Sequence, residues 1–81
     1  MARKSRVFPI IRGIIAMANG LDEEEVLLES KLRDDLGLDS IDIAELAVKV
    51  EKEFAISIKD ETINDFATVE NVVDYVVKVV W

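Results

Sequence analysis

The stretch from Ser40 to Phe54 constrains the fold most strongly, because its apolar residues recur at the spacing of one helix face. The stripe consists of Ile43, Leu46, Ala47, Val50 and Phe54. Charged residues occupy mostly the opposite face, so the pattern predicts an amphipathic helix from about Ser40 to about Phe54. Such a stripe is buried only against other elements. The chain has 81 residues, which suffice for one small domain over residues 1–81. The other helices of that domain would bury the stripe.

A first helix is predicted to begin between Ser5 and Pro9, because proline is tolerated in a first helical turn. It ends at Asn19-Gly20, where both residues tolerate a left-handed backbone. Residues 20–39 then form a long connection with room for a short helical turn in 21–26. Gly37 allows a tight turn just before Ser40. Five leucines are expected to anchor this connection to the core: Leu27, Leu28, Leu32, Leu36 and Leu38.

The C-terminal part of the chain predicts two more helices. A short one spans Asp60 to Asp65, and Thr68 caps another that reaches toward Val79. The last segment is rich in valine, which favours strand, but its valines recur at helical spacing. The segment Ile56-Ser57-Ile58 alternates like a strand and is too short to form a sheet. We therefore predict an all-α fold, a small four-helix bundle with a short third helix and a long loop between helices one and two.

The charge of the chain is unevenly distributed. The net charge is −7, yet the only charged residues before Asp22 are Arg3, Lys4, Arg6 and Arg12. The rest of the chain has 6 basic (10 minus 4) and 17 acidic residues, a balance of −11. An acidic surface argues against nucleic acid as a partner and steers basic surfaces toward the protein. The apolar stretch 7–18 is too short to cross a bilayer, so no membrane insertion is expected. The default expectation is a cytoplasmic location, and we expect the protein to be a monomer.

The chain contains neither cysteine nor histidine. Its own side chains therefore form no thioester and run no imidazole acid–base chemistry. The acidic residues Asp34, Asp35, Asp39 and Asp42 do not follow the spacing of a calcium loop, so no metal site is predicted. No catalytic triad, zinc set, Walker loop or dinucleotide glycine pattern is present.

The run from Leu36 to Asp42, Leu-Gly-Leu-Asp-Ser-Ile-Asp, resembles the modification motif of acyl carrier proteins. Two further pieces at family-like spacing support the resemblance: Gly20 to Val26, and Ile58 to Glu61 followed by Ala67-Thr68-Val69 and Asp74-Tyr75-Val76. The similarity extends from about Ile10 to Val79. It implies a bundle of the acyl-carrier type that bears a covalent 4′-phosphopantetheine arm on Ser40.

The resemblance also implies a function. The chain would shuttle acyl thioesters on the arm between enzymes of fatty-acid or specialised lipid or polyketide-type synthesis. Asp39 would help a phosphopantetheinyl transferase position a metal ion. The other implied partners are acyl-transfer, ketosynthase and reductase-type enzymes with basic docking surfaces, which would bind Asp35, Asp42, Glu45 and Glu51. Eight residues match positions that line the family's acyl pocket: Leu32, Leu46, Val50, Ile58, Ile63, Phe66, Val72 and Tyr75.

Some residues depart from the family's pattern. Ile41 follows the serine in place of leucine, Lys49 and Lys52 interrupt the acidic helix, and Ile63 and Phe66 are bulky for a pocket lining. These departures favour a specialised pathway over a housekeeping fatty-acid carrier, which remains a close alternative. A second alternative is a non-carrying interaction or structural subunit with a carrier-like fold, in which Ser40 only caps the helix.

Overall fold

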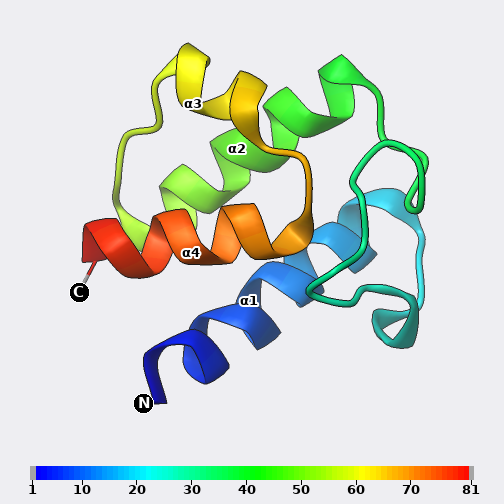
Figure 1. The fold of residues 1–81 in the computed structure, drawn as a ribbon, viewed down its shortest axis with the longest axis horizontal. Coiled ribbons are helices and arrows are strands. Elements are labelled where there is room, and N and C mark those ends of the chain that lie inside the picture. Colours follow the sequence, from blue (N-terminus) through cyan, green and yellow to red (C-terminus); the bar gives the residue numbers. More distant parts are fainter. Residues whose placement is uncertain (1, 81) are drawn as a thin grey trace.

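The computed structural model describes residues 2–80, and its regular structure is helical, with a long, largely non-helical connection before residue 40 (Figure 1). Its elements are α1 (Ala2–Asn19), the 3₁₀ turn η1 (Glu23–Glu25), α2 (Ser40–Phe54), α3 (Asp60–Asp65) and α4 (Val69–Val80). Within the described residues no strand forms, and the only sheet-like pairing is an isolated antiparallel bridge between Lys31 and Thr68. The predicted all-α fold is confirmed, including the bounds of α2 and α3.

The start of α1 was predicted wrongly, because the helix begins at Ala2 and contains Pro9. A proline inside a helix removes one backbone hydrogen bond and crowds the preceding turn. Tertiary contacts offset this cost. The side chain of Val7 is fully buried, and the ammonium group of Lys4 pairs with Glu70 and, at 3.1 Å, with Asp74 of α4. The turns before Pro9 are therefore held by packing against α4.

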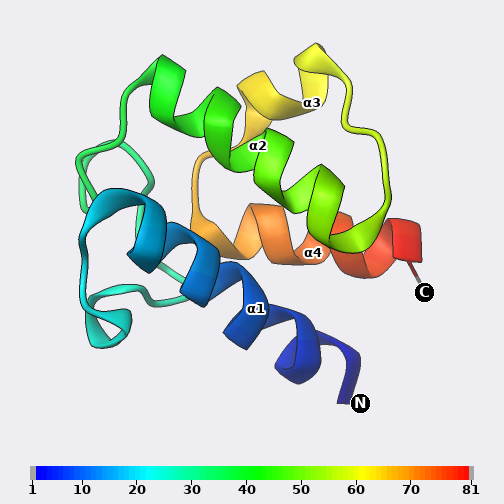
Figure 2. The same cartoon turned by 180° about the vertical axis from the view of Figure 1, so that it is seen from behind.

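The core lies where α1, α2 and α4 meet. α1 packs most extensively against α4 and next against α2, while α3 contacts α2. In both views α3 lies at the side of the molecule away from α1 (Figures 1 and 2). The predicted apolar stripe of α2 is buried except for Phe54, which is half-buried. The largest fully buried side chains are Val7, Ile11, Ile15, Val26, Leu32, Val50, Val69, Val72, Val73 and Val76.

The long connection is tied to the start of α4 by backbone hydrogen bonds. Leu32 N–H donates to Ala67 C=O, Val69 N–H to Ser30 C=O, and Glu70 N–H to Leu28 C=O, at 2.9–3.0 Å. These bonds satisfy two of the donors that a helix N-terminus leaves free, as well as polar groups of the loop. The connection is consequently a packed part of the fold, which fixes the segment that leads into α2.

The expected leucine anchors are only partly correct. Leu32 and Leu38 are buried, and Leu28 and Leu36 are half-buried. Leu27 was predicted wrongly, since 43% of its surface is exposed. Its backbone N–H bonds the buried Ser30 hydroxyl at 3.0 Å in a turn that leaves the Leu27 side chain outside. The neighbouring Val26 is fully buried and fills the core position.

Candidate functional site

Ser40 is the first residue of α2, and its side chain is exposed. The helix begins there because Asp39 caps it. Asp39 Oδ1 accepts the N–H of Asp42 at 2.9 Å, and Asp42 Oδ2 accepts the N–H of Asp39 at 3.1 Å. This reciprocal capping box satisfies two backbone donors with two carboxylates. The cap is thus Asp39, and the hydroxyl of Ser40 is left available for another use.

A compact turn holds the residues before Ser40. Gly37 has a φ of 72°, and its N–H donates to the C=O of Arg33 at 3.0 Å. Glycine takes this left-handed conformation without the steric cost that a Cβ adds. Leu38, buried to 4% exposure, donates its N–H to Leu32 C=O at 2.9 Å. The predicted tight turn is confirmed, and it fixes Ser40 relative to the core.

The guanidinium group of Arg33 contacts the candidate serine directly. Arg33 Nη2 donates a hydrogen bond to Ser40 Oγ at 3.1 Å, between two exposed side chains. The compact turn between them brings together residues seven positions apart. Sequence reasoning missed this contact because a loop arginine has no periodicity that places its side chain.

The capping carboxylate of Asp39 is held in its charged form. Its pKa lies below the ordinary 3.8, chiefly because the backbone N–H of Asp42 bonds to it. The Asp42 side chain, the N–H of Ile41 and the positive charge of Arg33 lower the pKa further. Hydrogen bonds and a nearby cation favour the ionised carboxylate. The N-terminus of α2 therefore carries a permanent negative charge beside Ser40 at neutral pH.

The four predicted docking carboxylates are in different environments. Asp35 and Glu45 are exposed, although Asp35 Oδ2 accepts the N–H of Lys31 at 2.7 Å. Asp42 is half-buried in the capping box. Glu51 is also half-buried, and its Oε2 accepts the N–H of Ile58 at 2.6 Å. The structure thus uses Glu51 to satisfy the backbone of the segment between α2 and α3.

Comparison with known proteins identifies the family of this chain. Residues 9–76 match the family model described as the phosphopantetheine attachment site. The chain belongs to the acyl carrier protein family. It is 43% identical over 72 residues to an acyl carrier protein of Onion yellows phytoplasma, which spans 89% of this chain and 95% of that protein. It is 37% identical over 78 residues to an acyl carrier protein of Thermotoga maritima, spanning 96% of both.

Family membership confirms an acyl carrier protein with 4′-phosphopantetheine as its covalent cofactor. The residues at the start of α2 fit such a group, because the Ser40 hydroxyl is exposed and adjoins the cationic Arg33. Phosphate esters are well matched by a guanidinium group. The attachment residue, the docking residues and the acyl-pocket residues remain predictions.

The eight residues predicted to line an acyl pocket of this carrier are mostly packed in the core. Six of them are buried to 8% exposure or less: Leu32, Leu46, Val50, Ile58, Phe66 and Val72. Ile63 and Tyr75 are half-buried. The rings of Phe66 and Tyr75 meet edge to face with centroids 6.0 Å apart, and both line a surface pocket between α3 and α4. Of the residues predicted to line an acyl pocket, these two aromatic residues are the ones that border this surface pocket.

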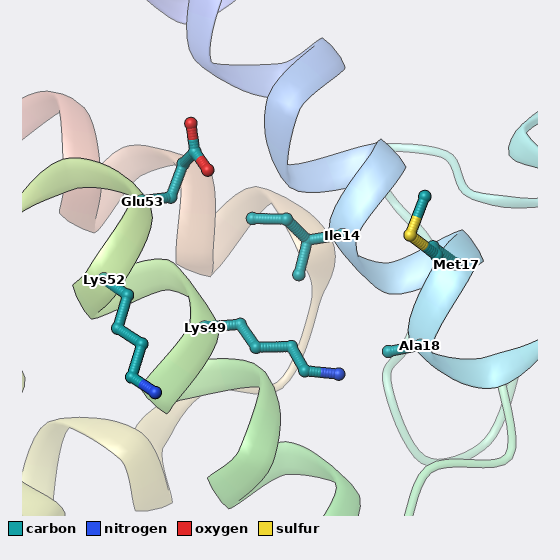
Figure 3. Close-up of a pocket in the computed structure, with 6 residues that line it drawn as sticks. All are labelled: Ile14, Met17, Ala18, Lys49, Lys52 and Glu53. Carbon is teal, nitrogen blue, oxygen red and sulfur yellow. The ribbon is translucent and has the colours of Figure 1, made fainter.

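The carrier also has an open groove of about 350 Å³ between α1 and α2 (Figure 3). It is lined by Ile14, Met17, Ala18, Lys49, Lys52 and Glu53. The Met17 side chain is 89% exposed at its edge. Neither Lys49 nor Lys52 has an ion-pair partner within 4.0 Å among residues 2–80. The two lysines noted above as departures from the family's acidic pattern thus line a groove that does not include Ser40.

Two further findings concern residues 2–80. In this part of the chain no three acidic side chains gather closely enough to hold a metal ion. None of its helices combines the length and the apolar character that crossing a membrane requires.

Proposed function

We propose that Ser40 carries the phosphopantetheine arm of this acyl carrier protein. The observation that carries the proposal is the exposed hydroxyl of Ser40 at the first position of α2, inside the motif Asp39-Ser40-Ile41. Because Asp39 caps the helix, modification of the hydroxyl breaks no backbone hydrogen bond of the cap. A transferase reaches the oxygen without unfolding the helix end.

The attachment reaction requires little of this chain beyond the hydroxyl. Ser40 Oγ attacks the pantetheine-bearing phosphorus of coenzyme A, and the bond to the bridging oxygen of the pyrophosphate breaks. The nucleotide half leaves, and a base on the transferase takes the hydroxyl proton. The chain offers no histidine for that role. Asp39, which stays ionised beside the serine, is proposed to face the divalent ion of the transferase.

We propose that the holo protein transports acyl groups and has no catalytic activity of its own. The bound arm supplies a thiol for thioester formation, which the side chains of a chain without cysteine do not provide. The proposed setting is fatty-acid or specialised lipid or polyketide-type synthesis, carried out in the cytoplasm by a monomeric carrier. The partners are acyl-transfer, ketosynthase and reductase-type enzymes.

The proposed docking surface surrounds Ser40 on the exposed side of α2. Asp35, Asp42 and Glu45 supply negative charge, while Glu51 contributes its charge from a half-buried position. The exposed side chain of Ile41, at 69% exposure, offers an apolar contact next to the serine. A basic partner groove would be attracted by the charges and would bind weakly enough to release the carrier.

Intact mass spectrometry tests the attachment site. The apo protein is incubated with coenzyme A and a promiscuous phosphopantetheinyl transferase, and we expect one phosphopantetheine increment. Ser40→Ala should abolish the increment, whereas Ser57→Ala, which removes another exposed serine hydroxyl, should retain it. A folded, unmodified wild-type chain that gains no mass would favour the alternative of a non-carrying interaction subunit.

A charge-reversal pair tests the docking surface. Glu45→Lys should raise the KM of the transferase for the carrier, and the increase should shrink at high salt. Glu24→Lys, an equal change of charge on η1, is the matched control. Equal kinetics for the two variants would argue against docking through α2.

A further inference from the structure

Arg33 is distinguished by the contact of its side chain with the hydroxyl of Ser40. Among the described residues its guanidinium group forms no ion pair within 4.0 Å, and its recorded contact is the 3.1 Å hydrogen bond to Ser40 Oγ. Exposed ion pairs contribute little to stability, so a surface arginine is not bound to pair with a carboxylate. Here the cation instead lies against the one hydroxyl that the proposed function modifies.

The neighbouring carboxylates have other partners. Asp35 accepts the N–H of Lys31, and Asp39 and Asp42 accept each other's backbone N–H groups. The carboxylate of Asp39 also has a lowered pKa and stays charged. A phosphodiester on Ser40 Oγ would therefore add a negative charge beside anions that already occupy the helix N-terminus. Arg33 is the adjacent cation able to compensate that charge.

We propose that Arg33 is the positioning residue for the phosphodiester that links Ser40 to its arm. This inference rests on the proposed attachment at Ser40. A phosphodiester formed there begins at the oxygen atom that Arg33 already contacts, so a small side-chain shift brings the guanidinium group to a phosphate oxygen. Arginine suits this role because its planar group offers several donors and remains charged. The contact would restrain the base of the arm and offset its repulsion from Asp39.

The experiment compares the apo and holo forms of four proteins: wild type, Arg33→Gln, Arg33→Lys and Lys31→Gln. Lys31 is an exposed basic residue of the same turn, and its replacement by glutamine makes the same change of charge. Mass spectrometry first verifies one increment in each protein. The thermal midpoint of each form is then measured by circular dichroism, and the phosphodiester is observed by ³¹P NMR.

We expect modification to change the thermal midpoint by a similar amount in the wild-type protein and in Lys31→Gln. In Arg33→Gln, modification should lower the midpoint by about 2–6 °C more, because the new charge is uncompensated. The extra loss should vanish at roughly 1 M salt, and Arg33→Lys should restore part of it. The ³¹P resonance of Arg33→Gln should be shifted from that of wild type, and the Arg33 Nε–H resonance of wild type should move on modification.

The outcomes separate the two proposals. A wild-type chain that gains no mass overturns the attachment at Ser40. If all four proteins are modified and Arg33→Gln matches Lys31→Gln in both midpoint and ³¹P resonance, the attachment stands and the role of Arg33 is refuted. If Arg33→Gln resists modification, the test is the Arg33 Nε–H resonance of the wild-type protein, compared between its apo and holo forms. A resonance that is unchanged on modification refutes the role of Arg33 in positioning the phosphodiester.

Discussion

Replacing Glu51 by alanine tests whether this residue serves the fold or a partner. In the structure Glu51 Oε2 accepts the backbone N–H of Ile58 at 2.6 Å, and Ile58 is only 7% exposed. Removing the carboxylate leaves that donor without a partner in a largely dry position. A buried unsatisfied donor costs about 1–3 kcal/mol. We therefore expect Glu51→Ala to lower the free energy of unfolding by about 2 kcal/mol.

Urea unfolding followed by circular dichroism measures this loss, and a thermal melt supports it. For a domain of this size, about 2 kcal/mol corresponds to a fall in the thermal midpoint of roughly 8–16 °C. Glu51→Gln keeps an acceptor but loses its charge, so it should cost about half as much as the alanine variant. Glu53→Ala is the control, because Glu53 is exposed on the same helix with the same charge, and we expect a change within about 0.5 kcal/mol.

Two results would refute this account. One is a Glu51→Ala protein as stable as Glu53→Ala, which would mean that the bond to Ile58 contributes nothing. The other is a Glu51→Gln protein with nearly full stability but strongly slowed modification by the transferase. That result would assign Glu51 to docking through its charge, as the family resemblance implies.

Three further predictions concern the C-terminal end of α2, the capping carboxylate and the ion pair of α1. Ala55 ends α2 with a φ of 57°, so Ala55→Gly should stabilise the protein by about 0.5–1 kcal/mol in urea unfolding, whereas Ala44→Gly within α2 should destabilise it by about 1 kcal/mol. The pKa of Asp39 is lowered from 3.8, so its ionised form stabilises the fold above that pH, and the stability advantage over Asp39→Asn should shrink as pH falls below about 4. The pKa of Lys4 is raised from 10.5, chiefly by Glu70, so the advantage over Lys4→Met should hold below that pH and be lost as pH rises beyond it. An advantage that is constant with pH would contradict either assignment.

Local patterns predicted most of the helical structure. The apolar stripe placed α2, and Thr68 was correctly expected to cap α4, where its Oγ1 accepts the N–H of Asn71 at 3.2 Å. Helical spacing rather than strand propensity was the correct guide to the valine-rich segment, because tertiary burial decides between them. The apolar spacing that predicts burial of one helix face involves residues within a few turns of one another, so it is visible in the sequence.

The errors and omissions arose where distant residues decide. The turns before Pro9 are helical because Lys4 pairs with α4 and Val7 is buried in the core, and these contacts depend on the tertiary fold. The chain takes a left-handed conformation at Ala55, where the residue type gave no warning. At the site, sequence indicated Ser40 and its acidic neighbours, but only the folded turn brings Arg33 to the hydroxyl. Contacts of this kind form only in the folded protein.

The packing of α1 against α4 brings the two ends of this carrier's chain together. Lys4 and Glu70 are 66 positions apart, so the chain must close over most of its length before its core is complete. Contacts of large sequence separation form late and leave apolar faces exposed until they do. A nascent chain that has not yet produced α4 lacks the surface on which α1 and the loop before Ser40 are ordered. If Ser40 is the attachment site as proposed, we expect a transferase to meet an ordered serine only once synthesis has passed α4, so that unfinished chains do not receive the arm.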